Sequence, residues 1–380
     1  TGRLANVLAH DLKNTILCDD FGEEKFGDLT GSISADFIQP WFFSPRNSVS
    51  AGVFLERQSV APVFVREAVG LRVGLNRTLG VGTLMGLSYR PQLTRLQEDE
   101  VFYCSAYLIC APEEIALLQG SNLLSPVNLT LSRDRRNQAL SPTRGYSLAA
   151  DFEHAAVWTG SDFLYTRVLT DATWYAQPRS NWVVATRLKG GWVGPGAFEG
   201  FAGAEGSTKI VHPEKRLDGG GSNSVRGFAQ NRWGPSVLYL DEVGKLMGSK
   251  GGCTAEEVAD LSCDAGGLSD DSFFPSPSGG TRLLEGSVEL RFPVSGSLWE
   301  GATFLDFGQI WDEGTSPRLA DLEVTPGFGV RYFSPIGPIR VDLGYRFGSG
   351  EELPVVTRRI ELRPDTELGY EEFDDLVVLD

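Results

Sequence analysis

Apolar and polar residues alternate strictly along several segments of this chain. In residues 287–294 every second side chain is apolar, and the positions between them hold Ser287, Glu289, Arg291 and Pro293. In residues 339–347 five apolar residues alternate with charged residues or glycine, and residues 69–76 and 146–153 repeat the pattern. A period of two residues puts each set on one face of a β-strand, whereas a helix would mix them. The pattern therefore predicts an all-β protein.

About fourteen segments fit this strand pattern. They lie near residues 29–43, 48–59, 64–78, 82–94, 123–135, 144–157, 162–177, 181–194, 282–295, 301–311, 324–334 and 338–348, with two further candidates at 3–17 and 355–363 whose alternation is less regular. Tight connections, such as residues 44–47 and 334–338, alternate with long ones, such as 95–122 and 195–281. Short periplasmic turns and long external loops are typical of outer-membrane barrels.

The polar face of these strands is rich in charges and glycine, as expected for a barrel with an apolar exterior and a polar lumen. Apolar runs are too short for a transmembrane helix, which needs about 20 residues, so a membrane span must be a closed sheet. The alternative to a membrane barrel is a soluble β-sandwich with an aromatic core.

Aromatic residues lie near the ends of several predicted strands, as in the girdles at the two membrane interfaces of a barrel. They are Trp41, Phe42, Phe43, Trp174, Tyr175, Trp182, Trp192 and Trp311.

Composition narrows the classes of function. The chain has 380 residues, a hydrophobic content of 41% and a net charge of −16, with a pI near 4.7. This content argues against a disordered chain, and the acidity argues against nucleic-acid binding, which needs clustered Lys and Arg. The chain starts at Thr1 without an apolar leader, so we expect either a removed signal peptide or a fragment.

Four of the five cysteines form two close pairs in polar segments: Cys104 with Cys110, and Cys253 with Cys263, while Cys18 stands apart. Such short-range pairs suit disulfides made in an oxidising compartment. Free thiols and metal ligation are the alternatives, although no histidine lies near either pair and we predict no metal site.

Catalysis has little support in the sequence. There is no Gly-x-Ser-x-Gly elbow and no His-Glu-x-x-His motif, and the three histidines are scattered. We therefore predict that the chain is not an enzyme and uses no cofactor.

Arg226 stands in a glycine-rich loop, residues 219–228, between strands of the predicted barrel. Glycines give the loop backbone conformations that other residues rarely adopt. If this loop folds into the lumen, the guanidinium needs carboxylate partners, because an unpaired buried charge is costly.

Three stretches resemble the BamA and TamA-like outer-membrane assembly barrels, whose shared unit is the bacterial surface antigen domain. They are residues 220–228 with 233–235, similar to the family's inward-folded loop; residues 134–137 with 141–146, similar to a strand-turn-strand signature; and residues 327–342, similar to the penultimate hairpin. The resemblance implies a transmembrane antiparallel β-barrel of about 16 strands in the complete domain. An extracellular loop of such a barrel folds inward.

The resemblance also assigns residues to this loop. Its motif consists of Gly221, Val225, Arg226, Gly227 and Phe228. It implies that acidic residues on later strands hold the arginine, and Glu289 and Asp306 match as lumen clamp partners of Arg226. Both fall on the polar phase of their strands, and a planar guanidinium suits bidentate pairing with a carboxylate. Ordinary solvation of these carboxylates in a polar lumen is the alternative.

The same resemblance implies the organisation and function of the protein. We expect the barrel in residues 1–350, an acidic loop in 351–380 leading to a missing closing strand, and N-terminal POTRA repeats that are absent from this chain. The implied function is insertion and folding of β-barrel proteins in the bacterial outer membrane. Outer-membrane lipids, unfolded β-barrel clients and accessory lipoproteins are the implied partners. A two-partner-secretion-like translocation pore or a plugged porin is the alternative.

Overall fold

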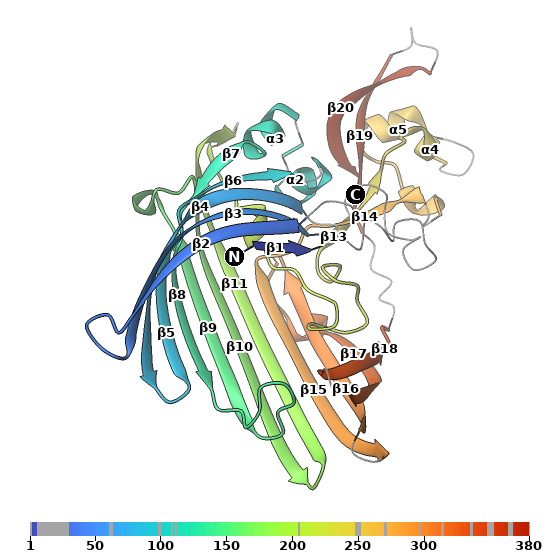
Figure 1. The fold of residues 1–380 in the computed structure, drawn as a ribbon. Coiled ribbons are helices and arrows are strands. Elements are labelled where there is room, and N and C mark those ends of the chain that lie inside the picture. The colour runs from blue at the N-terminus through green and yellow to red at the C-terminus, as the bar shows by residue number, and fades with distance from the viewer. Residues whose placement is uncertain are drawn as a thin grey trace.

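The computed structural model describes residues 2–5, 30–60, 64–97, 100–107, 109–110, 112–203, 206–247, 252–269, 272–295, 298–312, 315–334, 337–347, 353–363 and 368–379. Most of them build one antiparallel sheet of 16 strands that curves around a lumen (Figure 1). Its main path runs β1-β2-β3-β4-β5-β8-β9-β10-β11-β15-β16-β17-β18.

The strands of this sheet follow the chain order. They are β1 Gly2–Ala5, β2 Thr30–Pro40, β3 Asn47–Val60, β4 Phe64–Gly80, β5 Thr83–Tyr89, β6 Gln92–Gln97, β7 Ser121–Leu124, β8 Val127–Asp134, β9 Gly145–Ala155, β10 Phe163–Arg179, β11 Trp182–Gly203, β12 Gly206–Lys209, β15 Arg282–Ser295, β16 Trp299–Trp311, β17 Glu323–Ser334 and β18 Gly337–Gly344. We call the end with the short turns, such as that between β10 and β11, the turn end. The opposite end, with the long connections, is the loop end.

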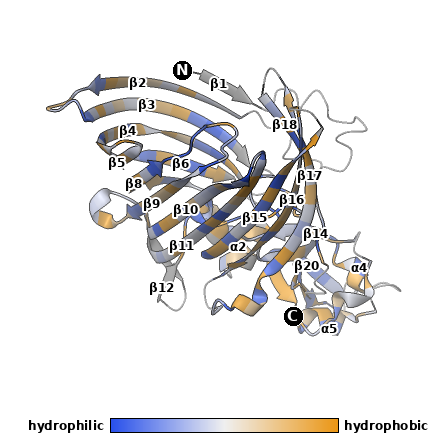
Figure 2. Ribbon diagram, turned by 90° about the horizontal axis from the view of Figure 1, so that it is seen from below, coloured by the Kyte–Doolittle hydropathy of each residue, from blue (hydrophilic) through white to orange (hydrophobic). Residues whose placement is uncertain are grey.

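The alternation of apolar and polar residues separates the two faces of the sheet. On β4, Val69, Leu71 and Val73 are 50 to 53% exposed on the outside, whereas Arg66 and Ala68, on the other phase, are buried. Figure 2, seen from the turn end, shows the resulting mixture of hydropathies along each strand. An apolar exterior and a charged interior are the arrangement of a barrel in lipid.

Two predicted strands are each divided by a proline. The segment predicted at 82–94 is split at Pro91 into β5 and β6, and that at 123–135 is split at Pro126 into β7 and β8. Proline has no N–H to donate to the ladder, but its carbonyl still accepts. The Pro91 oxygen accepts from the Leu71 amide at 2.9 Å, and the Pro126 oxygen accepts from the Arg90 amide at 3.1 Å. The sheet therefore stays continuous across both breaks.

A second, four-stranded sheet lies at the loop end. It has the order β14-β13-β19-β20 and joins β13 Ser236–Leu240 and β14 Phe274–Pro277 to β19 Val355–Leu362 and β20 Tyr370–Leu379. The strand predicted at 355–363 is therefore present as β19, but it joins this second sheet and not the barrel, and the segment predicted as a loop in 351–380 holds β19 and β20 in its described residues. Val355 and Ile360 are buried against the connection between β11 and β15, while Asp375 pairs with Arg359 at 3.2 Å.

Short helices fill the long connections. They are α2 Glu100–Tyr107, α3 Pro112–Leu118, α4 Gly244–Met247 and α5 Ala255–Ala259, with 3-10 turns η1 Val157–Thr159, η2 Pro213–Lys215, η3 Ala265–Gly267 and η5 Leu319–Asp321. Val101 and Cys104 of α2 pack in one buried cluster with Val237, Val356 and Leu376 of the four-stranded sheet. Two connections and the segment that follows β18, all distant from one another in sequence, therefore pack together at the loop end.

Both predicted cysteine pairs are disulfide-bonded in the structure, with Cα–Cα distances of 4.3 Å for Cys104–Cys110 and 5.6 Å for Cys253–Cys263. Each disulfide closes a short loop within one connection at the loop end. Cys18 lies outside the described residues.

The predicted aromatic girdles need correction at two positions. Trp174 and Trp192 are 52% and 44% exposed on the outer face, as expected. Trp311 is buried, and its Nε1 donates to Asp321 Oδ2 at 3.3 Å. Tyr175 is on the lumen phase of β10, where the Arg291 guanidinium lies 5.8 Å from its ring. Aromatic character alone does not reveal the phase of a strand position.

Among the described residues, no helix is both long enough and apolar enough to cross a membrane.

Candidate functional site

The connection between β11 and β15 folds back against the inner wall of the barrel; we call residues 210–235 of it the lumen loop. Val225, Phe228 and Trp233 form a buried cluster with Leu283 of β15 and Ile310 of β16. This apolar contact holds the loop against the wall.

Two consecutive glycines, Gly220 and Gly221, set the path of the lumen loop. Gly220 and Gly221 have φ values of +99° and +88°, a region that favours glycine. The Gly221 amide donates to the Phe228 carbonyl at 2.9 Å and thereby closes the tip of the loop. Arg226 points from this tip towards the wall.

Asp306 of β16 forms a two-pronged pair with Arg226. Arg226 Nε donates to Oδ2 at 2.7 Å, Nη2 donates to Oδ1 at 2.8 Å, and the Arg226 amide donates to Oδ2 at 3.0 Å. Asp306 is 1% exposed and Arg226 is 8% exposed. Fork-to-fork pairs of this kind combine charge with geometric specificity.

Two more strands supply partners for the same guanidinium. Arg226 Nη1 donates to Glu289 Oε2 of β15 and to Asp342 Oδ2 of β18, both at 2.9 Å. Nη2 also lies 3.3 Å from Ser287 Oγ. The face of the guanidinium covers the Phe304 ring, with Cζ 3.4 Å from the ring centroid. Arg226 thus joins three wall strands at one point.

The charges around Arg226 form a connected network. Glu289 accepts from Arg291 Nε at 2.7 Å and pairs with Arg331 at 2.5 Å, while Asp342 also pairs with Arg340 at 3.2 Å. Burial alone would lower the pKa of Arg226, but its bonds to Asp306, Glu289 and Asp342 raise that pKa above its ordinary value. The guanidinium is therefore a permanent cation.

Gly227 allows the close approach of the lumen loop to the wall. Its φ is +102°, and a Cβ at this position would lie 2.6 Å from Thr325 Cγ2 of β17. On its other side, a Cβ on Gly344 would lie 3.0 Å from the Gly227 nitrogen. Phe228 then packs beside Trp233, and the Arg346 guanidinium lies 4.6 Å from its ring.

Polar contacts on both sides fix the rest of the loop tip. Ser224 Oγ donates to Glu285 Oε2 at 2.9 Å, and Arg340 Nη2 donates to the Ser222 carbonyl at 2.6 Å. Arg187 of β11 donates to the Asn223 carbonyl and pairs with Glu285 at 3.1 Å.

The structure brings together all the residues predicted for the loop motif and its clamp. Glu289 and Asp306 contact Arg226 directly. The alternative, in which these carboxylates are only solvated in a polar lumen, therefore does not describe the structure. Sequence reasoning did not assign Asp342, Ser287 or Phe304 to this site. Asp342 lies on the polar face of its strand, and this could be seen in the sequence. The alternation does not show, however, that Asp342 lies close to Arg226. The part of the chain that the structure describes contains no cluster of His, Cys, Asp and Glu able to hold a metal ion.

Comparison with known proteins decides the family. The sequence matches the Omp85 superfamily domain over residues 23–361. The chain belongs to the Omp85 superfamily. This family assignment confirms the predicted all-β outer-membrane barrel and its location in the bacterial outer membrane, and it agrees with the prediction that the chain is not an enzyme. The comparison also confirms the resemblance to the BamA and TamA-like barrels that the sequence motifs indicated.

The individual relatives of this chain share less than a third of their aligned residues with it. The outer membrane protein assembly factor BamA of Neisseria meningitidis serogroup B is 29% identical over 226 residues, which cover 56% of this chain and 25% of that protein. The crystal structure of BamA from Haemophilus ducreyi lacking POTRA domains 1–3 superimposes with a TM-score of 0.61 at 18% identity, covering 84% of this chain and 59% of that one. CdiB from Acinetobacter baumannii gives a TM-score of 0.41 at 14% identity, covering 84% of this chain and 47% of that one. The chain thus spans about a quarter of the length of this Neisseria protein.

Proposed function

We propose that this chain is the barrel of an assembly factor that helps to insert and fold β-barrel proteins in the bacterial outer membrane. The family assignment and the similarity to an assembly factor support this proposal. The structural observation behind it is the lumen loop, which Arg226 ties to β15, β16 and β18. A plain porin keeps a water-filled channel, whereas here a loop occupies the lumen.

The proposed mechanism uses strand edges and needs no nucleotide. Unpaired N–H and C=O groups at a sheet edge template an incoming strand, and each new strand leaves a fresh edge for the next. In this proposal the clamp keeps β15 to β18 in a fixed arrangement while a client pairs at a strand edge. The proposed partners are unfolded β-barrel proteins and the lipids that contact the apolar exterior, with accessory lipoproteins as further partners.

Reconstitution tests this function. The full-length protein in liposomes is given an unfolded outer-membrane protein, and folding of the client is followed by its heat-modifiable mobility. We expect folding to be faster than in empty liposomes of the same lipid. Ion conductance without any acceleration would contradict the proposal and favour the translocation pore or the plugged porin.

A further inference from the structure

A second buried ion-pair group holds the lumen loop at the wall opposite the Arg226 clamp. Glu214 Oε1 of η2 lies 2.8 Å from Arg66 Nη1 of β4, and Lys215 Nζ lies 3.0 Å from Glu153 Oε1 of β9. The Arg66 side chain is 3% exposed and also pairs with Glu56 of β3 at 3.1 Å. Buried charges of this kind need partners, because one left alone is strongly destabilising.

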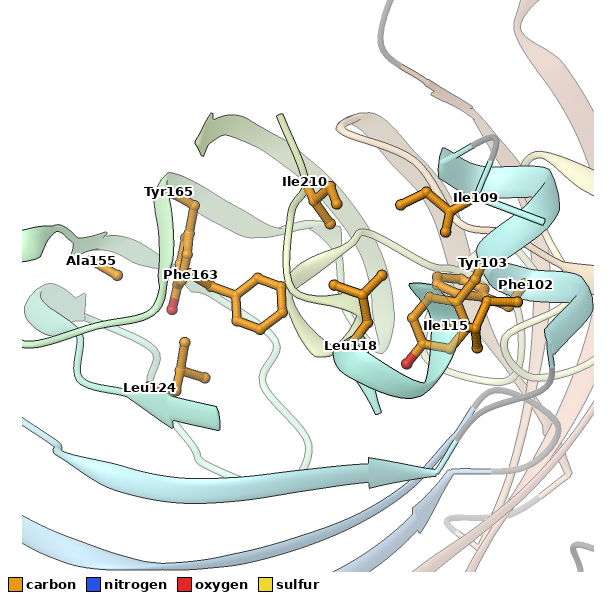
Figure 3. Close-up of a cluster of buried hydrophobic side chains, with 10 residues drawn as sticks. All are labelled: Phe102, Tyr103, Ile109, Ile115, Leu118, Leu124, Ala155, Phe163, Tyr165 and Ile210. Carbon is orange, nitrogen blue, oxygen red and sulfur yellow. The ribbon is translucent and has the colours of Figure 1, made fainter. Parts of the chain in front are cut away.

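Apolar packing surrounds these charges at the loop end. Ile210 lies in a buried cluster with Phe163 of β10 and with the side chains of α2 and α3 (Figure 3). The next residues are held as well: Tyr107 Oη donates to the Val211 carbonyl, and the rings of His212 and Phe163 pack in a T-shaped arrangement with their centroids 4.7 Å apart. The start of the lumen loop is therefore fixed in the N-terminal half of the barrel.

A continuous path of contacts connects η2 to Arg226. Arg216 Nε donates to the Ser278 carbonyl at 2.7 Å, and its Nη2 donates to Asp312 Oδ2 at 2.7 Å. Leu217 pairs with Gly280 in a β-bridge and packs in the same buried cluster as Val225. Coupling between two sites needs such a contiguous network of packed and hydrogen-bonded groups.

We propose that Glu214 and Lys215 form a second anchor that positions Arg226 in its clamp. The lumen loop then acts as a strut between the wall of β3, β4 and β9 and the wall of β15, β16 and β18. Glu214 and Lys215 are positioning residues, since their ion pairs are with Arg66 and Glu153 and they act on Arg226 only through the lumen loop. The proposal deepens the proposed assembly function and rests on it for its biological role, whereas the coupling between the anchors is a property of the barrel alone.

Trypsin cleavage of the folded full-length protein in detergent micelles tests this coupling. Lys215, Arg216 and Arg226 are each 8% exposed, so cleavage after them requires the loop to leave the lumen. In Glu214→Gln, Arg66 loses one partner, and we expect cleavage after both Arg216 and Arg226 to accelerate by about tenfold. The control is Glu242→Gln, the same chemical change in the same connection, where the side chain is 68% exposed and pairs with Lys245. Mass spectrometry identifies each cleaved bond.

Each outcome decides the proposal. Faster cleavage at both arginines in Glu214→Gln, with wild-type rates in Glu242→Gln, supports it. Faster cleavage after Arg216 with an unchanged rate after Arg226 would show that the anchor is only local, and an unchanged rate at both would show that it anchors nothing. If Glu214→Gln gives no heat-modifiable folded species, Glu214→Asp is tested in the same way. No client protein is needed, so this result is independent of the assembly assay.

Discussion

Arg226 and Asp306 meet with two parallel hydrogen bonds, Nε to Oδ2 at 2.7 Å and Nη2 to Oδ1 at 2.8 Å. They come from the tip of the lumen loop and from the inner face of β16. Because Asp306 is 1% exposed, water cannot readily replace the guanidinium. The pair therefore fixes both the position and the orientation of the loop tip.

We expect Arg226→Ala to destabilise the folded barrel by about 3–5 kcal/mol, since three wall carboxylates lose a buried partner. Arg226→Lys keeps the charge but loses the planar fork, so it should be intermediate. The urea midpoint of unfolding, followed by heat-modifiable mobility, measures both. Arg358→Ala, at a half-exposed position outside the lumen, is the control. Equal midpoints for wild type and Arg226→Ala would contradict the clamp.

The three carboxylates should differ in importance. Asp306 accepts three bonds from Arg226, counting the backbone amide, whereas Asp342 accepts one and also pairs with Arg340. We expect Asp306→Asn to lower the free energy of unfolding by at least about 1 kcal/mol more than Asp342→Asn does. The same urea titration gives the order, and the reverse order would show that the fork does not dominate.

Gly227→Ala should destabilise the protein for two separable reasons. A φ of +102° strains any residue with a Cβ, at about 1–3 kcal/mol, and that Cβ would also lie 2.6 Å from Thr325 Cγ2. Gly160→Ala, at φ +78° with nothing within 4 Å, shows the effect of backbone strain alone. Thr325→Ser in the Gly227→Ala background should recover only the steric part. Full recovery would mean that backbone strain at residue 227 is negligible.

Acid should loosen the start of the lumen loop. Burial lowers the pKa of His212 from 6.5 to about 4, with Glu214, Lys215, Arg66 and Glu153 as the charged neighbours. Between about pH 4 and pH 6.5, His212 is protonated in the unfolded chain but neutral in the folded one. Its contribution to the free energy of unfolding is therefore fully present above about pH 6.5 and is lost as the pH falls towards 4.

Hydrogen exchange of residues 210–217, corrected for the intrinsic effect of pH, measures this change between pH 7.5 and 5. We expect lower protection at pH 5 in wild type and a smaller difference in His212→Phe. His154→Phe, on β9, is the matched control. An equal pH effect in wild type and His212→Phe would assign the change to other groups.

The barrel strands could be predicted because each strand has one face in lipid and one in a polar lumen, which imposes a period of two residues. Glu289 and Asp306 follow from that period together with the family resemblance. Asp342 has the same phase, but its contact with Arg226 depends on how the sheet curves to bring β18 beside the loop tip.

The second anchor and the four-stranded sheet could not be predicted for a different reason. Arg66 and Glu214 are far apart in sequence, and nothing local to either residue indicates its partner. Strand β19 pairs in parallel with β13 of a distant connection, so its place depends on how the long connections pack. Local periodicity identifies strands but not the sheet that they join.

If the chain is an assembly factor, the Arg226 clamp should support its assembly activity. Client folding in liposomes should be measured with full-length wild type, Arg226→Ala and the control Arg358→Ala, at equal amounts of folded barrel. We predict that Arg358→Ala matches wild type, while Arg226→Ala folds client no faster than empty liposomes. Acceleration by Arg226→Ala equal to that of wild type would contradict a role of the clamp in assembly.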